Sequence, residues 1–302
     1  APARYALPVS AEPGLLTLRA FVQAPRPPGK GHEAATFKGG LEVHRRAVAS
    51  GVSLEVVRAG SGEPVILLPG LGSDISSFAR QSVLLSERFD VHGINPRGVS
   101  LSDSPEADVY PVEQTAADAA QVYEGAAHVI GASLGAAAAL ELALTQPDRV
   151  KTLTLITPFV EATPRLLAVG AAWGKLAGEA SSEALALALL PWLFSPGFLS
   201  DEGAQGRTLR GLAQMVARVP ANTLERMTAG LEAWSGSRRD DLSDLSVPTL
   251  VVAAGEDLLT PDASEIAQAI PQATLLRVET SGHAVALEEP EAVNEAILAH
   301  LG

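Results

Sequence analysis

The sequence predicts an α/β fold, with a mostly parallel eight-stranded sheet, helices on both faces and a helical insertion. Three observations predict it. Short apolar runs alternate with helical stretches along most of the 302 residues, an order typical of right-handed strand–helix–strand crossovers. The alternation stops between 159 and 237, where helical stretches follow one another without a clear strand. A Gly-x-Ser-x-Gly motif, residues 131–135, falls where a strand meets a helix.

Eight segments read as strands, because each is a short apolar or alternating run bounded by turn residues. The first two are joined by Ser50-Gly51, a hairpin signal. The later ones are nearly continuous apolar runs, as expected of strands buried on both faces. The predicted strands are Leu41–Ala49, Val52–Ala59, Pro64–Leu68, Phe89–Asn95, Ala127–Ile130, Val150–Thr157, Val247–Ala254 and Ala273–Val278.

Helical stretches separate these strands. We expect Asp118 on the exposed or capping side of the second of them. The predicted helices outside the insertion are Ser76–Arg88, Tyr110–Glu124, Leu134–Thr145, Pro261–Ile270 and Glu288–Leu301.

The chain therefore divides into a core of residues 41–158 and 238–302, a helical cap insertion of residues 159–237, and an N-terminal extension of residues 1–40. Breaker clusters at Pro25–Gly31 and Gly39-Gly40 set the extension apart. Two arrangements of this extension are compatible with its sequence: a short element around Leu15–Val22, or a strap that lies over the core.

Composition excludes several functions. The net charge of −13 argues against nucleic acid or an anionic membrane as a partner. The chain has no cysteine, so a thiolate nucleophile, a disulfide framework and Cys-ligated metal are excluded. No apolar stretch reaches the length of a transmembrane helix. No zincin, P-loop or EF-hand motif occurs, so we expect no metal and no cofactor.

Ser133 is the candidate nucleophile. It lies between Gly131 and Gly135 at a sharp strand-to-helix turn, the context that a nucleophile elbow requires. Such a turn strains the serine backbone, and flanking side chains would collide, so glycine is expected on both sides. The motif alone also occurs by chance in a chain with 27 glycines, and the remaining residues must support it.

A serine nucleophile needs a base and an orienting carboxylate. His283 is the candidate base, since of the six histidines it alone lies in the loop between the last strand and the last helix. Asp257, after the penultimate strand, is the candidate acid, with capping of its turn as the structural alternative. Glu161 is a second, less favoured acid.

Two backbone N–H groups are candidates for the oxyanion hole. Leu134 directly follows the nucleophile, and Leu71 lies between Gly70 and Gly72 after the third strand. The alternative for Leu71 is a simple tight turn. Metal-free stabilisation of an oxyanion by such groups is typical of acyl transfer.

The insertion holds all three tryptophans. We name as candidate pocket residues those aromatics that could line an apolar site, although packing of the cap on the core explains most of them equally well. Arg207, Arg210, Arg218 and Arg226 are expected on solvated helix faces. The candidate pocket residues are Phe159, Trp173, Trp192, Phe194 and Trp234.

Four motifs in chain order resemble the α/β-hydrolase superfamily, in its serine esterase and lactonase form with a helical cap, over about residues 41–301. They are Leu67–Gly72, similar to the oxyanion loop; Asn95–Asp103, similar to an Arg-Gly-x-Gly-x-Ser-Asp loop; the elbow; and Ser281–His283 with Glu288-x-Pro290-Glu291, similar to the histidine signature. Pro69, Ser100 and Ala132 depart from the family's usual residues.

The resulting hypothesis is a serine hydrolase that cleaves a small-to-medium hydrophobic carboxylic ester or lactone through an acyl-enzyme. Two alternatives remain. A carbon–carbon bond hydrolase or a cofactor-free perhydrolase uses the same triad, and a ligand-binding or receptor-like protein keeps the fold with little turnover. A homodimer is compatible with the sequence. The localisation stays open, because the opening residues Ala1–Tyr5 fit either a processed or an arbitrary start.

Overall fold

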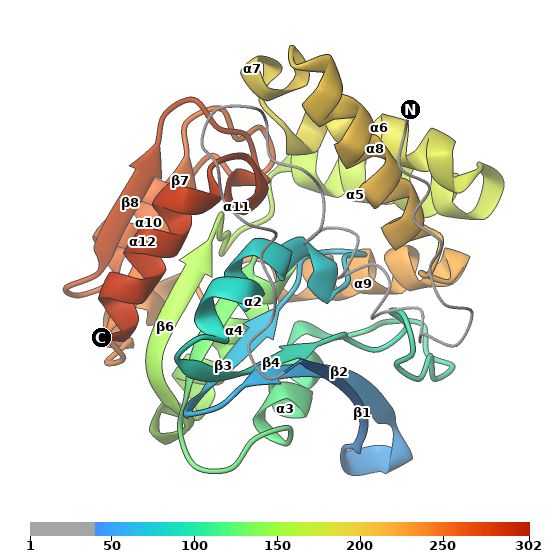
Figure 1. The fold of residues 1–302 in the computed structure, drawn as a ribbon. Helices are drawn as coiled ribbons and strands as arrows, with labels where there is room; N and C mark the ends of the chain where they lie inside the picture. Colours follow the sequence, from blue (N-terminus) through green and yellow to red (C-terminus); the bar gives the residue numbers. More distant parts are fainter. Residues whose placement is uncertain (1–39) are drawn as a thin grey trace.

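The computed structural model describes residues 40–302, so the predicted extension, with its element around Leu15–Val22, lies outside the described residues. One eight-stranded sheet forms the centre, in the order β1-β2-β4-β3-β5-β6-β7-β8 (Figure 1). β2 pairs antiparallel with β1 and β4, and all other neighbours are parallel. The strands are β1 (Leu41–Ala47), β2 (Ser53–Gly60), β3 (Glu63–Leu68), β4 (Phe89–Ile94), β5 (Ala127–Ala132), β6 (Val150–Ile156), β7 (Thr249–Ala254) and β8 (Thr274–Val278).

The predicted fold class is confirmed, including eight strands and helices on both faces. The helices are α2 (Ala79–Leu85), α3 (Val112–Ala120), α4 (Leu134–Thr145), α5 (Pro164–Glu179), α6 (Ser182–Leu193), α7 (Pro196–Leu199), α8 (Glu202–Val216), α9 (Ala221–Trp234), α10 (Ala263–Ala269), α11 (Val285–Glu288) and α12 (Pro290–Leu301). Short 3-10 turns at Ala49–Gly51, Ile75–Phe78, Pro147–Arg149 and Asp240–Asp244 complete the chain.

Successive side chains of the central strands enter different layers of the core, because strand residues alternate between the two faces of a sheet. In β3, Val65 and Leu67 pack in the layer that holds α2, α11 and α12. Ile66 and Leu68 pack in the opposite layer with α3, α4 and α10. Both faces are thus buried here, which explains why residues 65–68 form a continuous apolar run.

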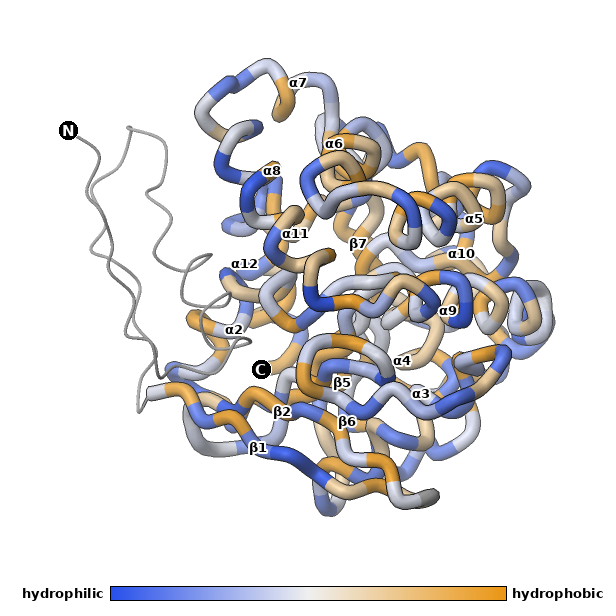
Figure 2. The backbone as a smooth tube through the Cα atoms, turned by 90° about the vertical axis from the view of Figure 1, so that its right-hand side faces the viewer, coloured by the Kyte–Doolittle hydropathy of each residue, from blue (hydrophilic) through white to orange (hydrophobic). Residues whose placement is uncertain are grey.

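Several elements differ at their ends from the sequence prediction. The expected helix over 76–88 is a 3-10 turn followed by α2, and the expected helix over 110–124 shrinks to α3. Pro111 lies at the start of α3 in an extended conformation, so the helix begins only after it. The outer strand β1 is mostly exposed, and Figure 2 shows hydrophilic residues along it.

Helices α5, α6, α7 and α8 lie together above one end of the sheet (Figures 1 and 2). α5 packs along α9, and α6 packs along α8. The α6–α8 pair has its own apolar cluster, centred on Leu190, Phe194 and Met215. Within the described part of the chain, no helix combines the length and apolarity needed to cross a membrane.

Candidate active site

Ser133 lies between β5 and α4 in a strained backbone conformation. Its φ is 54° and its ψ −116°, a region that residues other than glycine rarely adopt. The Ser133 N–H donates to the carbonyl of Ile156 in the neighbouring strand β6 at 2.9 Å. The carbonyl of Ser133 accepts hydrogen bonds from Ala136 and Ala137 at the start of α4. The turn is therefore fastened on both sides, and this holds the serine in its unfavourable geometry.

The two glycines of the motif are required by close backbone contacts. A Cβ atom on Gly131 would lie 2.1 Å from the carbonyl oxygen of Gly135. A Cβ atom on Gly135 would lie 2.0 Å from the carbonyl oxygen of Leu68, the last residue of β3. Helix α4 thus begins directly against the end of β3, in the manner that the motif predicts.

The loop after β3 runs beside the serine. A Cβ atom on Gly70 would lie 3.3 Å from the Cβ of Ser133 and 3.9 Å from its Oγ. Among residues 40–302, the N–H groups of Leu71 and Leu134 have no hydrogen-bond acceptor. Both predicted oxyanion donors are therefore unoccupied backbone donors, in the loop beside Ser133 and at the first position of α4.

Asp257 and His283 form a buried pair in the loops after β7 and β8. The distance from Nδ1 of His283 to Oδ2 of Asp257 is 2.8 Å, and the two residues are only 8% and 5% exposed. Burial alone would raise the pKa of the Asp257 carboxyl. The facing His283 and the hydrogen bonds from Thr260 outweigh it, so this pKa lies below its ordinary value.

The loop of Asp257 also holds the carboxylate in place. Oδ1 accepts the N–H groups of Leu259 at 2.8 Å and Thr260 at 3.1 Å. Oδ2 accepts the hydroxyl of Thr260 at 2.7 Å, beside His283. A carboxylate fixed in this way keeps the proton on Nδ1 of the imidazole and leaves Nε2 to act as a base.

Within the described residues, no hydrogen bond joins Ser133 to His283, and Nε2 of His283 has no partner. The hydrogen bonds of catalytic residues are often long before substrate binds. The three residues follow β5, β7 and β8, which are parallel, so they share the carboxyl edge of the sheet. Ligands of open α/β sheets bind at this edge.

The competing acids lie elsewhere. Glu161 is exposed and paired with Arg239, whose Nη1 lies 2.6 Å from Oε2. Glu256, next to Asp257, is exposed as well. Among the other histidines that the structure describes, His128 contacts Thr152 and Glu63 near the opposite end of β5.

The family is decided by comparison with known proteins. The family described as "alpha/beta hydrolase fold" matches residues 63–290. This chain belongs to the α/β-hydrolase family. It is 30% identical over 253 residues to the protein named "Putative carbamate hydrolase RutD" of Azorhizobium caulinodans, a match that covers 80% of this chain and 92% of that one.

Solved structures agree with this fold. An esterase from Thermogutta terrifontis has a TM-score of 0.76 at 23% identity, over 86% of this chain and 98% of its own. The enol-lactonase from Burkholderia xenovorans LB400 has a TM-score of 0.76 at 24% identity, over 85% of this chain and 99% of its own. The chain is thus an enzyme of the α/β-hydrolase type.

The aromatic residues predicted for a pocket are mainly packing residues of this hydrolase. Phe159, Trp173, Phe194 and Trp234 are buried in apolar clusters, and Trp192 is partly buried against the core. Phe159 meets Trp234 edge to face, and the indole N–H of Trp234 donates to Glu141 at 3.0 Å. Their contact with a substrate stays a prediction.

A small pocket opens between α3, α4 and α9, and of the candidate active-site residues only Leu134 lines it. Leu134 and Ala138 form one wall along α4, and Met227 of α9 closes it from the insertion. The remaining lining residues are Pro96, Arg97, Tyr110, Pro111, Val112, Gln114 and Thr115.

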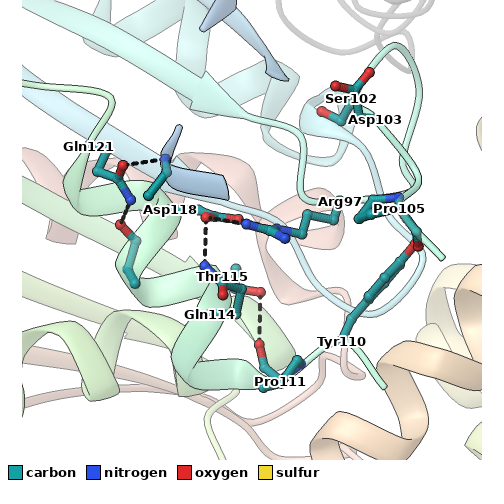
Figure 3. A network of polar contacts seen from close by, with 12 residues as sticks. Arg97, Ser102, Asp103, Pro105, Tyr110, Pro111, Gln114, Thr115, Asp118 and Gln121 are labelled. Carbon is teal, nitrogen blue, oxygen red and sulfur yellow. Dashed lines mark hydrogen bonds and ion pairs between the residues drawn. The ribbon is translucent and has the colours of Figure 1, made fainter. Parts of the chain in front are cut away.

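A network beside this pocket corrects the expectation for Asp118, which is buried (Figure 3). Arg97 donates to Asp118 through Nε at 2.7 Å and through Nη2 at 2.9 Å, and Gln114 adds a third hydrogen bond. Arg97 comes from the loop after β4 and Asp118 from α3. A two-pronged pair of this kind satisfies both buried charges, which helical periodicity alone cannot anticipate.

Two of the four arginines expected on solvated faces are also largely covered. Arg218, just after α8, donates to the buried Asp74 at 3.1 Å. Arg226 of α9 lies over the ring of Tyr110 and donates to its hydroxyl at 3.2 Å. Both arginines attach the insertion to core loops, so the prediction of solvated faces is wrong for them.

Sequence reasoning gave no structural role to three residues that contact the candidate site. Thr260 donates a hydrogen bond to Asp257. Asp74 lies three residues after Leu71 and accepts the N–H of Ser76. Glu288 accepts the N–H of Gly282, next to His283. For Thr260 a signal existed, since an Asp followed three residues later by Thr is typical of a side-chain-supported turn. Their distant partners, Arg218 for Asp74 and Ser195 for Glu288, lie more than 90 residues away along the chain, where no local sequence signal reaches.

Proposed function

We propose that this chain is a serine hydrolase that cleaves a small-to-medium hydrophobic carboxylic ester or lactone through an acyl-enzyme. The observation that carries the proposal is the buried hydrogen bond between His283 and Asp257, at the sheet edge where the strained Ser133 also lies. A base oriented by a carboxylate beside a serine elbow fits acyl transfer.

In the proposed cycle, Nε2 of His283 takes the hydroxyl proton of Ser133 as Oγ attacks the substrate carbonyl. Asp257 holds the imidazole and stabilises its positive charge. The N–H groups of Leu71 and Leu134 receive the oxyanion. The leaving alkoxide takes the proton from His283, and a water activated by the same histidine then cleaves the acyl-enzyme.

Two observations bear on the substrate. The pocket beside Leu134 is small, and its lining includes the apolar side chains of Val112, Leu134 and Met227, which favours a small acyl or alcohol group. The relative from Azorhizobium caulinodans is named a carbamate hydrolase, and this favours a small carbamate as the second candidate. Attack on a carbamate carbonyl would use the same residues.

The test is a panel of p-nitrophenyl esters of increasing chain length, simple lactones and small carbamates, combined with labelling by a fluorophosphonate. We expect turnover that is highest for short chains, and labelling that is lost in Ser133→Ala. His283→Ala should lose on the order of 10⁴-fold in kcat/KM or more. Asp257→Asn should lose far more activity than Glu161→Gln.

Other outcomes separate the rival functions. Absence of both turnover and labelling would favour a ligand-binding protein and defeat the proposal. Labelling without ester, lactone or carbamate turnover would favour carbon–carbon bond hydrolysis or perhydrolysis. An equal loss in Asp257→Asn and Glu161→Gln would reject the assignment of the acid.

A further inference from the structure

The carboxylate of Glu288, at the end of α11, joins the histidine loop to the helical insertion. Oε1 accepts the N–H of Gly282 at 2.9 Å and the N–H of Ser195 at 3.1 Å. Oε2 accepts the hydroxyl of Ser195 at 2.6 Å. Gly282 directly precedes His283, and Ser195 directly precedes α7. One side chain therefore bonds two segments that lie almost 90 residues apart in the chain.

A second tie lies on the other side of His283. The N–H of Ala284 donates to the carbonyl of Leu193 at 2.7 Å. The residues before and after the histidine are thus both held by the turn between α6 and α7. This turn, residues 193–195, is called the α6–α7 turn below.

The contact between the two segments is tight. A Cβ atom on Gly282 would lie 2.8 Å from the backbone nitrogen of Ser195 and 2.9 Å from the carbonyl carbon of Phe194. Ser195 is 2% exposed. Ala284 and Leu287 pack on the apolar cluster of the insertion. A shift of the α6–α7 turn therefore cannot occur without moving the backbone of His283.

Burial opposes this arrangement electrostatically. Burial raises the pKa of Glu288, and its three hydrogen bonds lower the pKa only in part. A neutral side chain would fill the same space at less cost in solvation. The carboxylate is distinguished by accepting all three donors at once, with Oε1 shared between the two backbone segments.

We propose that Glu288 is a positioning residue, which couples the placement of the insertion to the backbone of the catalytic base through Gly282 and Ser195. The proposal rests on the proposed function of His283. The placement of the α6–α7 turn then sets the direction of the imidazole toward Ser133, so a displacement of this turn misaligns the base.

The experiment compares Glu288→Ala, Glu288→Gln and Ser195→Ala with Glu289→Gln, the same kind of change at the exposed neighbouring carboxylate. Turnover of a p-nitrophenyl ester is expressed per fluorophosphonate-labelled site, which removes the unfolded fraction from the comparison. Hydrogen exchange of the amides in 193–195 and 282–284 is measured on the same samples.

We expect Glu288→Ala to lose roughly tenfold to a hundredfold in kcat per labelled site, because small displacements of a catalytic group cost this much. KM should change far less. Glu288→Gln should retain more of kcat than Glu288→Ala, since its amide oxygen still accepts. Exchange should rise in both segments together in Glu288→Ala and stay unchanged in Glu289→Gln.

Unchanged kcat per labelled site in Glu288→Ala would overturn the proposal, as would faster exchange in one segment only. If Glu288→Ala does not fold, the same criteria apply to Ser195→Ala, which removes one of the three donors. A wild-type protein without turnover or labelling would defeat the proposed function, whereas the exchange data would still decide whether the two segments are coupled.

Discussion

Thr260 combines two roles at one position in the candidate site. Its N–H and its hydroxyl both reach Asp257, and the hydroxyl oxygen also lies 3.0 Å from the carbonyl of Thr157. Thr157 has a φ of 43°, a strained value at the end of β6. Thr260 therefore supports the acid and lies against the end of the strand beside the elbow.

Replacing Thr260 by Val removes the hydroxyl and keeps the shape. We expect a loss of about 1–3 kcal/mol in the free energy of unfolding, because Asp257 stays buried with one donor fewer. The kcat should fall as well, while Thr260→Ser should remain close to wild type. Urea unfolding and ester hydrolysis measure the two effects, and equal behaviour of the Val and Ser variants would contradict this role.

The contribution of Asp257 to the free energy of unfolding should depend on pH in the acid range. Its folded-state pKa lies below the ordinary value of 3.8, so its contribution to stability is present above that pH. The contribution is lost as the pH falls through the folded-state pKa. The unfolding free energy of Asp257→Asn should therefore decrease less steeply than that of wild type below about pH 4.

Urea titrations at a series of pH values test this expectation. Asp262→Asn, an exposed change in the same loop, is the control and should follow the wild-type slope. If the unfolding free energies of wild type and Asp257→Asn fall with pH at the same slope, the hydrogen bonds of Asp257 do not lower its pKa in the folded protein.

At the scale of elements, the insertion meets the oxyanion side of the core through the end of α8 and the start of α9. The carbonyl of Arg218 accepts the N–H of Ser100, whose φ is 53°. The hydroxyl of Thr223 donates to the carbonyl of Gly98 at 3.2 Å. A Cβ atom on Gly72 would lie 2.3 Å from a methyl carbon of Leu224.

Within this contact, the loss of Arg218 and the loss of Asp74 should reduce the free energy of unfolding by different amounts. Asp74 is almost fully buried, and burial raises its pKa, whereas Arg218 keeps part of its side chain in solvent. Arg218→Met leaves an unpaired buried carboxylate and should cost about 3–5 kcal/mol in unfolding free energy. Asp74→Asn leaves a guanidinium that keeps part of its contact with solvent, and it should cost less.

Chemical unfolding of the two variants gives the comparison, with Arg210→Met on the exposed side of α8 as the control. The reverse order of the two losses would show that the pair does not serve to neutralise Asp74. Leu71, the candidate oxyanion donor, lies three residues before Asp74, so Arg218→Met should lower ester turnover as well.

The elements themselves were largely predictable from the sequence. Apolar runs such as Val247–Ala254 mark β7 because both faces of the sheet are covered, and Leu134–Thr145 matches α4 at both ends. The order Ser133, Asp257, His283 follows from chain topology. Hydrophobic periodicity does not predict which residue a polar side chain will pair with. Asp118, Arg218 and Glu288 each pair across loops, and their environments follow only from three-dimensional packing.

At the scale of the whole molecule, the insertion returns to the core against α4. Glu141 of α4 accepts the indole N–H of Trp234 and two hydrogen bonds from Arg238, at 2.8 and 2.7 Å. Burial raises the pKa of Glu141, but the hydrogen bonds lower it by more than burial raises it. The pKa of Glu141 is therefore below its ordinary value. The helix that follows Ser133 thus also anchors the last part of the insertion.

Glu141→Gln should lower the unfolding free energy at neutral pH by about 1–3 kcal/mol, because the two hydrogen bonds from Arg238 lose their charged acceptor. The lowered pKa means that this difference exists above the ordinary value of 4.5 and narrows as the pH falls below it. Denaturant titrations at pH 7 and pH 4 measure the difference, with the exposed Glu232→Gln as the control. A difference that does not depend on pH would contradict the electrostatic origin.

The contact between Gly135 and the end of β3 has a consequence for protein engineering. The turn at Ser133 and the segment at the end of β3 meet through a backbone contact with no room for a single carbon atom, so neither can be reshaped alone. Saturation mutagenesis of 131–135 would mostly yield inactive, misfolded variants. Libraries that seek new substrates should instead vary positions such as Val112 and Met227, whose side chains line the pocket without touching this contact.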